Sequence, residues 1–136
     1  DDVRSYRAAA REPRYVSGFL CVLLALFTIV QYNDPDAILW ILIYGLPMIW
    51  AGFAAYRPSA FAHNRLFLGL FGLNFLAIGA GVIYMWPSEV STWWDREEVR
   101  EGLGLIITTV ALLLTTLTLW RSATVRAQER LAETVP

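Results

Sequence analysis

The hexapeptide Gln31-Tyr32-Asn33-Asp34-Pro35-Asp36 lies between two long apolar runs and decides how the chain folds. We expect Asp34 to cap a helix that begins at Pro35, because proline lacks the N–H that would be unpaired there and its fixed φ suits the first turn. Asp36 then places a negative charge near the positive end of the helix dipole. The hexapeptide therefore predicts the turn of a helical hairpin.

Three side chains of this turn carry oxygen atoms and allow a second interpretation. Asn33, Asp34 and Asp36 offer the kind of ligand that hard cations prefer. The turn is thus either a well-capped hairpin with no further role, or a site for a cation or a partner.

The composition of the 136 residues indicates a membrane protein, since 57% are hydrophobic and the mean hydropathy is +0.47. A helix needs roughly 20 residues, at about 1.5 Å each, to cross a hydrocarbon core of about 30 Å. The runs of suitable length are 15–32, 37–56, 66–86 and 102–120. They predict an all-α bundle of four transmembrane helices, built as two hairpins within a membrane domain over 15–120.

The two ends of the chain are polar. Arg4, Arg7 and Arg11 recur at spacings of three and four within the arginine-rich segment 1–14. This segment is either a short interfacial helix that ends near Pro13 or a disordered tail. The charged residues of 121–136 also recur at helical spacing, which predicts a helical extension into water.

The arginines predict how the bundle is oriented. Nine of the eleven lie before the first run, between the second and third, or after the fourth, together with five carboxylates. The opposite side holds two arginines and seven carboxylates, so the net charges are +4 and −5. The positive-inside rule then places both termini on the cytoplasmic side, or its organellar equivalent.

Single residues within the spans carry further expectations. Pro47 cannot donate to the carbonyl of Ile43, so a kink is predicted there, beside either a ligand cavity or ordinary packing. Asn74 needs a hydrogen-bond partner in hydrocarbon and should face the bundle or another protein. The threonines of 102–120 are candidate partners, unless they bond to their own helix and serve only for packing.

Cysteine and histidine are too scarce for several kinds of site. Cys21 is the single cysteine, which excludes a disulfide framework or zinc site from this chain alone and suits a small core residue. His63 is the single histidine, so no histidine pair is present to hold a haem. We expect His63 to be a solvated loop residue.

The acidic side carries its own signals. Trp86, Trp93 and Trp94 form an aromatic girdle, with Pro87 ending the third helix. Thr92 and Asp95 resemble a capping box, which would start the last helix near Trp93. Arg100 is expected to pair with Asp34 or Asp36 and so to tie the two hairpins together.

Two patches of sequence resemble a known family. The hexapeptide, followed by Trp40 and by Tyr44-Gly45, is similar to the signature of the transmembrane protein 220 family. A second patch, Glu98-Val99-Arg100-Glu101-Gly102-Leu103-Gly104-Leu105, resembles the acidic stretch before that family's last helix. The resemblance implies a small four-helix membrane protein, and the family brings no established activity with it.

The favoured functional hypothesis is a non-catalytic integral membrane protein that acts by protein–protein contact, as an accessory subunit of a respiratory, photosynthetic or transport complex. Its 19 aromatic residues and its small-residue helix faces support contact. One alternative is a carrier or enzyme for a lipid or hydrophobic metabolite. Another is an acidic cluster that binds Ca²⁺ or Mg²⁺ structurally.

The sequence predicts partners and candidate residues only in outline. Membrane lipids and other integral membrane subunits are expected partners, and nucleic acid is not. No motif encodes a cofactor, although a bound lipid or a partner-held pigment is compatible with the spans. No catalytic or metal-ligating residue is predicted. The binding or structural candidates are Asn33, Asp34, Asp36, Trp40, Tyr44, Gly45, Asn74, Glu98, Arg100 and Glu101.

Overall fold

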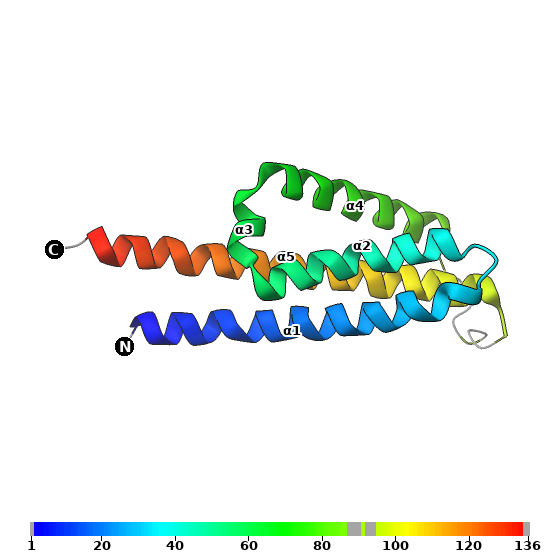
Figure 1. The fold of residues 1–136 in the computed structure, drawn as a ribbon, viewed down its shortest axis with the longest axis horizontal. Helices are drawn as coiled ribbons and strands as arrows, with labels where there is room; N and C mark the ends of the chain where they lie inside the picture. Colours follow the sequence, from blue (N-terminus) through cyan, green and yellow to red (C-terminus); the bar gives the residue numbers. More distant parts are fainter. Residues whose placement is uncertain (1, 87–90, 92–94, 135–136) are drawn as a thin grey trace.

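The fold is an all-helical bundle, seen in a computed structural model that describes residues 2–86, 91 and 95–134 (Figure 1). Its helices are α1 (Asp2–Val30), the 3₁₀ turn η1 (Gln31–Asn33), α2 (Ala37–Tyr56), α3 (Pro58–His63), α4 (Arg65–Tyr84) and α5 (Glu97–Thr134). Of these, α1, α2, α4 and α5 are long and apolar enough to cross a membrane. The predicted four-span architecture is confirmed.

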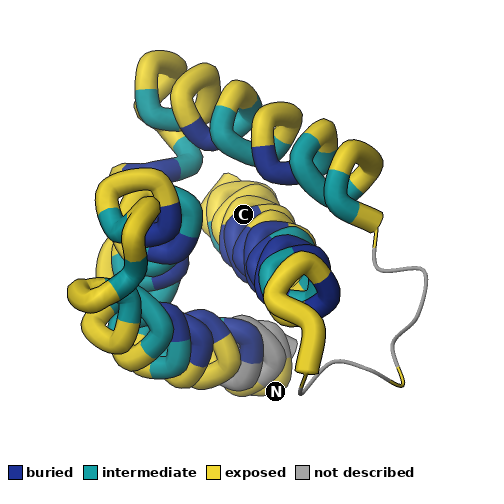
Figure 2. Tube along the Cα trace, turned by 90° about the vertical axis from the view of Figure 1, so that its right-hand side faces the viewer, coloured by how far each residue is buried: buried dark blue, intermediate teal, exposed yellow. Residues whose placement is uncertain are grey.

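Helix α5 is the central element of the bundle. It contacts α1, α2, α3 and α4, while α1 packs most extensively against α2. Figure 2 shows the buried face of α5 turned toward the other helices. The core between them includes the fully buried side chains of Leu24, Phe61 and Leu112. Both ends of the chain lie at the same end of the bundle (Figure 1), and the side of the membrane that they face stays a prediction.

Helix α4 is the least covered of the four spans. Only 11% of its apolar window is buried, against 50% for α5. In Figure 2 it lies across the outside of the bundle, with its outer face exposed along the helix. Most of α4 is therefore available to lipid or to another protein.

The prediction of a helix that ends near Pro13 is wrong, because α1 continues through this residue. A proline inside a helix removes one backbone hydrogen bond and crowds the preceding turn. Here packing against α5 stabilises the position. Pro13 is buried and its carbonyl accepts a hydrogen bond from the Thr118 hydroxyl at 2.9 Å. The Thr118 hydroxyl has one proton, so Ser17, whose oxygen lies 2.7 Å away, donates to it.

The hairpin turn also differs from the prediction. The Asp34 side chain accepts from the backbone N–H of Asp36 at 2.9 Å, which is an Asx turn and not a helix cap. Helix α2 then begins at Ala37, two residues later than expected, and Asp36 makes no side-chain cap bond. The local hydrogen bond of Asp34 competes with helix initiation at Pro35.

Three other element boundaries were predicted incompletely. The segment between the second and third spans contains the short helix α3, followed by Asn64, whose side chain caps α4 through the N–H groups of Leu66 and Phe67. Helix α4 ends at Tyr84, two residues before the predicted end. Helix α5 begins at Glu97 and not near Trp93, and it continues without a break into the predicted extension.

Some expectations fall outside the described residues. The girdle is described only at Trp86, which is exposed. Its other two tryptophans, the helix-ending proline and the threonine of the capping box are Trp93, Trp94, Pro87 and Thr92, and they lie outside the described part of the chain.

Candidate functional site

The strongest candidate site is a cavity of about 270 Å³ at the carboxylate-rich end of the bundle, where the α1–α2 turn meets the start of α5. Both sides contribute charged or polar groups. The lining residues are Gln31, Asp34, Trp40, Tyr44, Glu97, Arg100 and Glu101. We call this the turn cavity.

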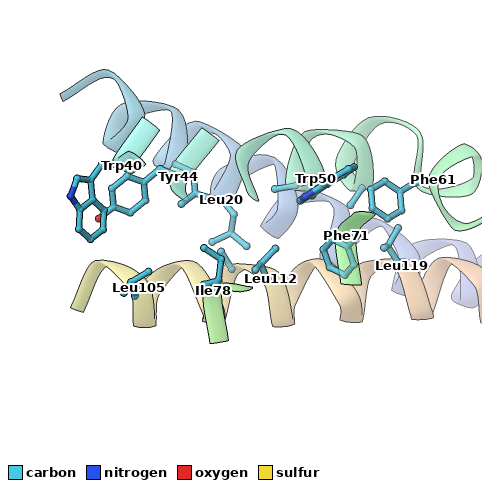
Figure 3. Close-up of a cluster of buried hydrophobic side chains, with 14 residues drawn as sticks. Leu20, Trp40, Tyr44, Trp50, Phe61, Phe71, Ile78, Leu105, Leu112 and Leu119 are labelled. Atoms are coloured by element: carbon cyan, nitrogen blue, oxygen red, sulfur yellow. The ribbon is translucent and has the colours of Figure 1, made fainter. Parts of the chain in front are cut away.

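Two aromatic side chains of α2 form one wall of the turn cavity. Trp40 and Tyr44 are one helical turn apart, and their rings stack with centroids 5.8 Å apart and planes at 28°. The Phe27 ring of α1 meets the Tyr44 ring edge-on, with ring centroids 5.5 Å apart. Trp40 and Tyr44 are only 4% and 6% exposed, and Figure 3 shows them together at one end of the core. This packing fixes both rings before any ligand arrives.

A glycine of α5 allows the Tyr44 ring to lie where it does. A Cβ built on Gly104 would collide with the Tyr44 hydroxyl and would stand 3.2 Å from its ring carbon Cζ. Only a residue without a side chain leaves that space free. The two sequence patches around Tyr44 and Gly104 are therefore in direct contact.

The first turn of α5 supplies the charges of the opposite wall. Glu97, Arg100 and Glu101 are spaced by three and four residues, so they share one face of the helix. With Asp34 from the turn, three carboxylates and one guanidinium line the same small space. Carboxylates near the N-terminus of α5 also interact favourably with its helix dipole.

The structure brings together half of the predicted candidates. Asp34, Trp40, Tyr44, Arg100 and Glu101 line the turn cavity. Arg100 and Asp34 line the same cavity. The ion pair proposed between Arg100 and Asp34 or Asp36 stays a prediction.

The other candidates lie elsewhere. Asn33 and Asp36 are exposed on the turn. Glu98 is exposed and pairs with Arg96 at 3.3 Å. Gly45 faces Thr28 in the α1–α2 seam, where an added Cβ would stand 3.8 Å from the Thr28 methyl group. Its role is close helix packing.

Asn74 has a partner in α2 and not among the threonines. The Trp50 indole N–H donates to Asn74 Oδ1 at 3.2 Å. Thr108 and Thr115 instead donate to carbonyls four residues earlier in α5, at 2.8 Å each. The alternative of a packing stripe therefore describes these two threonines, and the Asn74 side chain links α4 to α2.

The alternative of a cation site at the turn stays a prediction. Among the residues that the structure describes, no group of three or more histidine, cysteine or acidic side chains is placed to hold a metal ion. His63 is exposed and its Nδ1 lies 2.8 Å from the carbonyl of Ser59, within its own short helix.

Sequence reasoning missed the polar contacts at the opposite end of the bundle. Arg14 Nε donates to the carbonyl of Ala55 at 2.8 Å, and its terminal nitrogen donates to that of Tyr56 at 3.2 Å. These are the last carbonyls of α2, which a cation stabilises. The position of Arg14 just before an apolar run was a signal, but its partner is about forty residues away.

Comparison with known proteins agrees with the two patches described above. The family model described as "Transmembrane family 220, helix" matches residues 23–117. The chain belongs to the transmembrane protein 220 family. Every residue that lines the turn cavity falls inside the part that matches this family.

A curated member of the family is similar over the same region. Transmembrane protein 220 of Xenopus laevis is 36% identical over 91 residues, which cover 62% of this chain and 48% of the frog protein. The chain thus matches about half the length of that relative. No solved structure matches this chain.

Proposed function

We propose that this member of the transmembrane protein 220 family is a non-catalytic integral membrane protein that acts by contact, as an accessory subunit of a larger membrane complex. The observation that supports the proposal most directly is the open glycine face of α4. The proposed contact is a transmembrane helix of another subunit.

The glycines of this face contact no side chain among the residues that the structure describes. A Cβ added at Gly69, Gly72 or Gly79 would meet nothing within 4 Å. By contrast, one added at Gly52 would stand 3.3 Å from the Cys21 sulfur, and Gly81 faces Leu105 at 3.5 Å. Glycine in a helix interior costs roughly 1 kcal/mol relative to alanine, so an open glycine face suits a partner that approaches closely.

The exposed residues between these glycines support the same proposal. At 100° per residue, Gly69, Gly72 and Gly79 fall on one face with Leu76 and Ile83. Leu76 is 72% exposed and Ile83 is 81% exposed. Small residues beside large apolar ones form the kind of surface on which a second membrane helix packs.

Photo-crosslinking in native membranes tests this proposal. A photoreactive residue at Leu76 is expected to give one discrete protein adduct, whereas the same residue at Val22, 61% exposed on α1, should give lipid adducts. Replacing Gly72 with leucine should abolish the Leu76 adduct, and a Cβ at this position meets no described atom within 4 Å. Thermal unfolding of the Gly72→Leu variant checks that the fold is kept.

Two results would contradict the proposal. Lipid adducts alone from Leu76 would make the glycine face a lipid-facing surface. A protein that purifies from mild detergent without any co-migrating membrane subunit, with the Leu76 adduct also absent, would exclude the accessory role.

A further inference from the structure

The walls of the turn cavity present both signs of charge and two uncommitted donors, a combination that suits a zwitterion. We propose that the cavity binds the headgroup of a phosphatidylethanolamine molecule, with its ammonium toward the carboxylates and its phosphate toward the donors. This site is separate from the open face of α4, so it stands or falls independently of the accessory role.

The two donors are the polar atoms of the aromatic wall. Trp40 and Tyr44 are more than nine-tenths buried, and both line the cavity. Within the described part of the chain, neither the Trp40 indole N–H nor the Tyr44 hydroxyl makes a hydrogen bond. Among the described residues no buried side-chain nitrogen or oxygen atom lacks a partner, so these two donor atoms are open to the cavity. A ligand in the cavity that accepts hydrogen bonds can therefore reach both of them.

The anionic part of the ligand follows from the donors. Arg100 lines the same cavity as Trp40 and Tyr44. A phosphate group accepts hydrogen bonds from all three types of donor, and arginine is especially suited to it.

The cationic part follows from the carboxylates. Asp34, Glu97 and Glu101 give the cavity wall three negative charges against the one positive charge of Arg100. Among the described residues these carboxylates are not grouped to hold a metal ion. The zwitterionic headgroup adds no net charge, but its ammonium places a positive charge beside the carboxylates, and its N–H groups can donate to separate carboxylates.

Size and position favour a lipid as the source of this headgroup. A volume of about 270 Å³ is just below the range of roughly 300–1,000 Å³ that is typical of sites for drug-sized ligands, and it suits a small polar group. The cavity lies at the ends of apolar helices, and helices of this length that cross a bilayer bring such an end to the headgroup region. The acyl chains can then remain in the hydrocarbon beside α1 and α2.

Lipid titration of the purified full chain tests the proposal. Thermal unfolding and native mass spectrometry would be followed with phosphatidylethanolamine, phosphatidylcholine and phosphatidylglycerol that carry identical acyl chains. Phosphatidylethanolamine is expected to bind saturably and to raise the unfolding temperature. Phosphatidylglycerol, which lacks the ammonium, is expected to bind at least about tenfold more weakly. Phosphatidylcholine, whose ammonium cannot donate hydrogen bonds, should fall between them.

Matched variants show whether binding occurs in the turn cavity. Tyr44→Phe and Arg100→Gln should each weaken phosphatidylethanolamine binding about tenfold, because each removes one hydrogen bond to a charged group. Tyr84→Phe and Arg96→Gln are the controls, since both residues are exposed and lie outside the cavity lining. The controls should bind the lipid as the unaltered chain does.

The outcomes are separable. Equal binding of phosphatidylglycerol and phosphatidylethanolamine, or unchanged binding by Tyr44→Phe, would overturn the proposal. Free phosphoethanolamine shares the ammonium and phosphate chemistry. Saturation by this compound at the same concentration as the lipid would assign the cavity to a soluble metabolite and overturn the lipid assignment.

Discussion

At the scale of single residues, Gly104 is the position where the fold tolerates least change. Its Cα hydrogen faces the Tyr44 hydroxyl, so the rotamer of Tyr44 and the wall of the turn cavity depend on the absence of a side chain there. Buried aromatic rings cannot shift without disturbing their neighbours, here Trp40 and Phe27.

Gly104→Ala is expected to lower the free energy of unfolding by about 1–3 kcal/mol, because the added methyl group overpacks the Tyr44 contact. The measurement is thermal unfolding of the detergent-purified chain. Gly79→Ala is the control, since its methyl group meets open space and alanine favours helix by up to about 1 kcal/mol. In the double variant Gly104→Ala/Tyr44→Phe, loss of the hydroxyl should recover part of the stability. Equal stability of Gly104→Ala and Gly79→Ala would contradict the contact.

At the scale of helices, the elements are joined by a few polar contacts far apart in sequence. Arg14 links α1 to the end of α2, and Trp50 with Asn74 links α2 to α4. Ser17 with Thr118 links α1 to α5 over 101 residues of chain. Apolar faces alone allow helices to slide or rotate, so these bonds fix their register.

Arg14→Gln is expected to destabilise the bundle by about 1 kcal/mol, because the last carbonyls of α2 lose a cationic donor. The readout is the unfolding temperature in detergent. Arg11→Gln is the matched control, because Arg11 is exposed one turn earlier on the same helix. This substitution should change the free energy of unfolding by less than about 0.5 kcal/mol. An equal effect of the two substitutions would show that net charge, and not the α2 carbonyls, explains the loss.

A double-mutant cycle measures the bond between α2 and α4. Trp50→Phe and Asn74→Ala should be coupled by about 0.6–1.7 kcal/mol, the range found for side-chain hydrogen bonds in membranes. A cycle of Trp50→Phe with Thr116→Ala is the reference and should show no coupling, because Thr116 is exposed and bonds to its own helix at 2.9 Å. Coupling of equal size in both cycles would argue against a specific bond.

At the scale of the whole molecule, the uneven distribution of arginine predicts which end faces the cytoplasm. The exposed positions Asn33 in η1 and His63 in α3 lie beyond opposite ends of α2, so they report the orientation directly.

In a Cys21→Ala background, Asn33→Cys should react with an impermeant maleimide added outside intact cells. His63→Cys should react only after permeabilisation, because nine of the eleven arginines are predicted to remain on its side. Labelling is read by gel shift, with both variants labelled in detergent as the reference for full reaction. Modification of both positions from one side would show that the predicted threading is wrong.

The features that were predictable from sequence are those that depend on neighbouring residues. Apolar run length predicts the spans, and the polar hexapeptide predicts the turn. The turn cavity was predictable in part, since Asp34 and Tyr44 were candidates but Glu97 was not. The continuation of α1 through Pro13, and the partners of Asn74 and Arg14, depend on helices that meet only after folding. No local pattern encodes those contacts.

The length of α5 has a mechanical consequence. Its 38 residues form one rod of about 57 Å, roughly twice the hydrocarbon thickness, so its final turns project well into water. A rocking motion of about 10° around the middle of this rod moves each tip by about 5 Å. The first turn of α5 carries Glu97 and Glu98, and Arg130 lies near the opposite end of the helix. A tilt imposed at one tip therefore displaces the other tip by a similar distance without any rearrangement of the backbone.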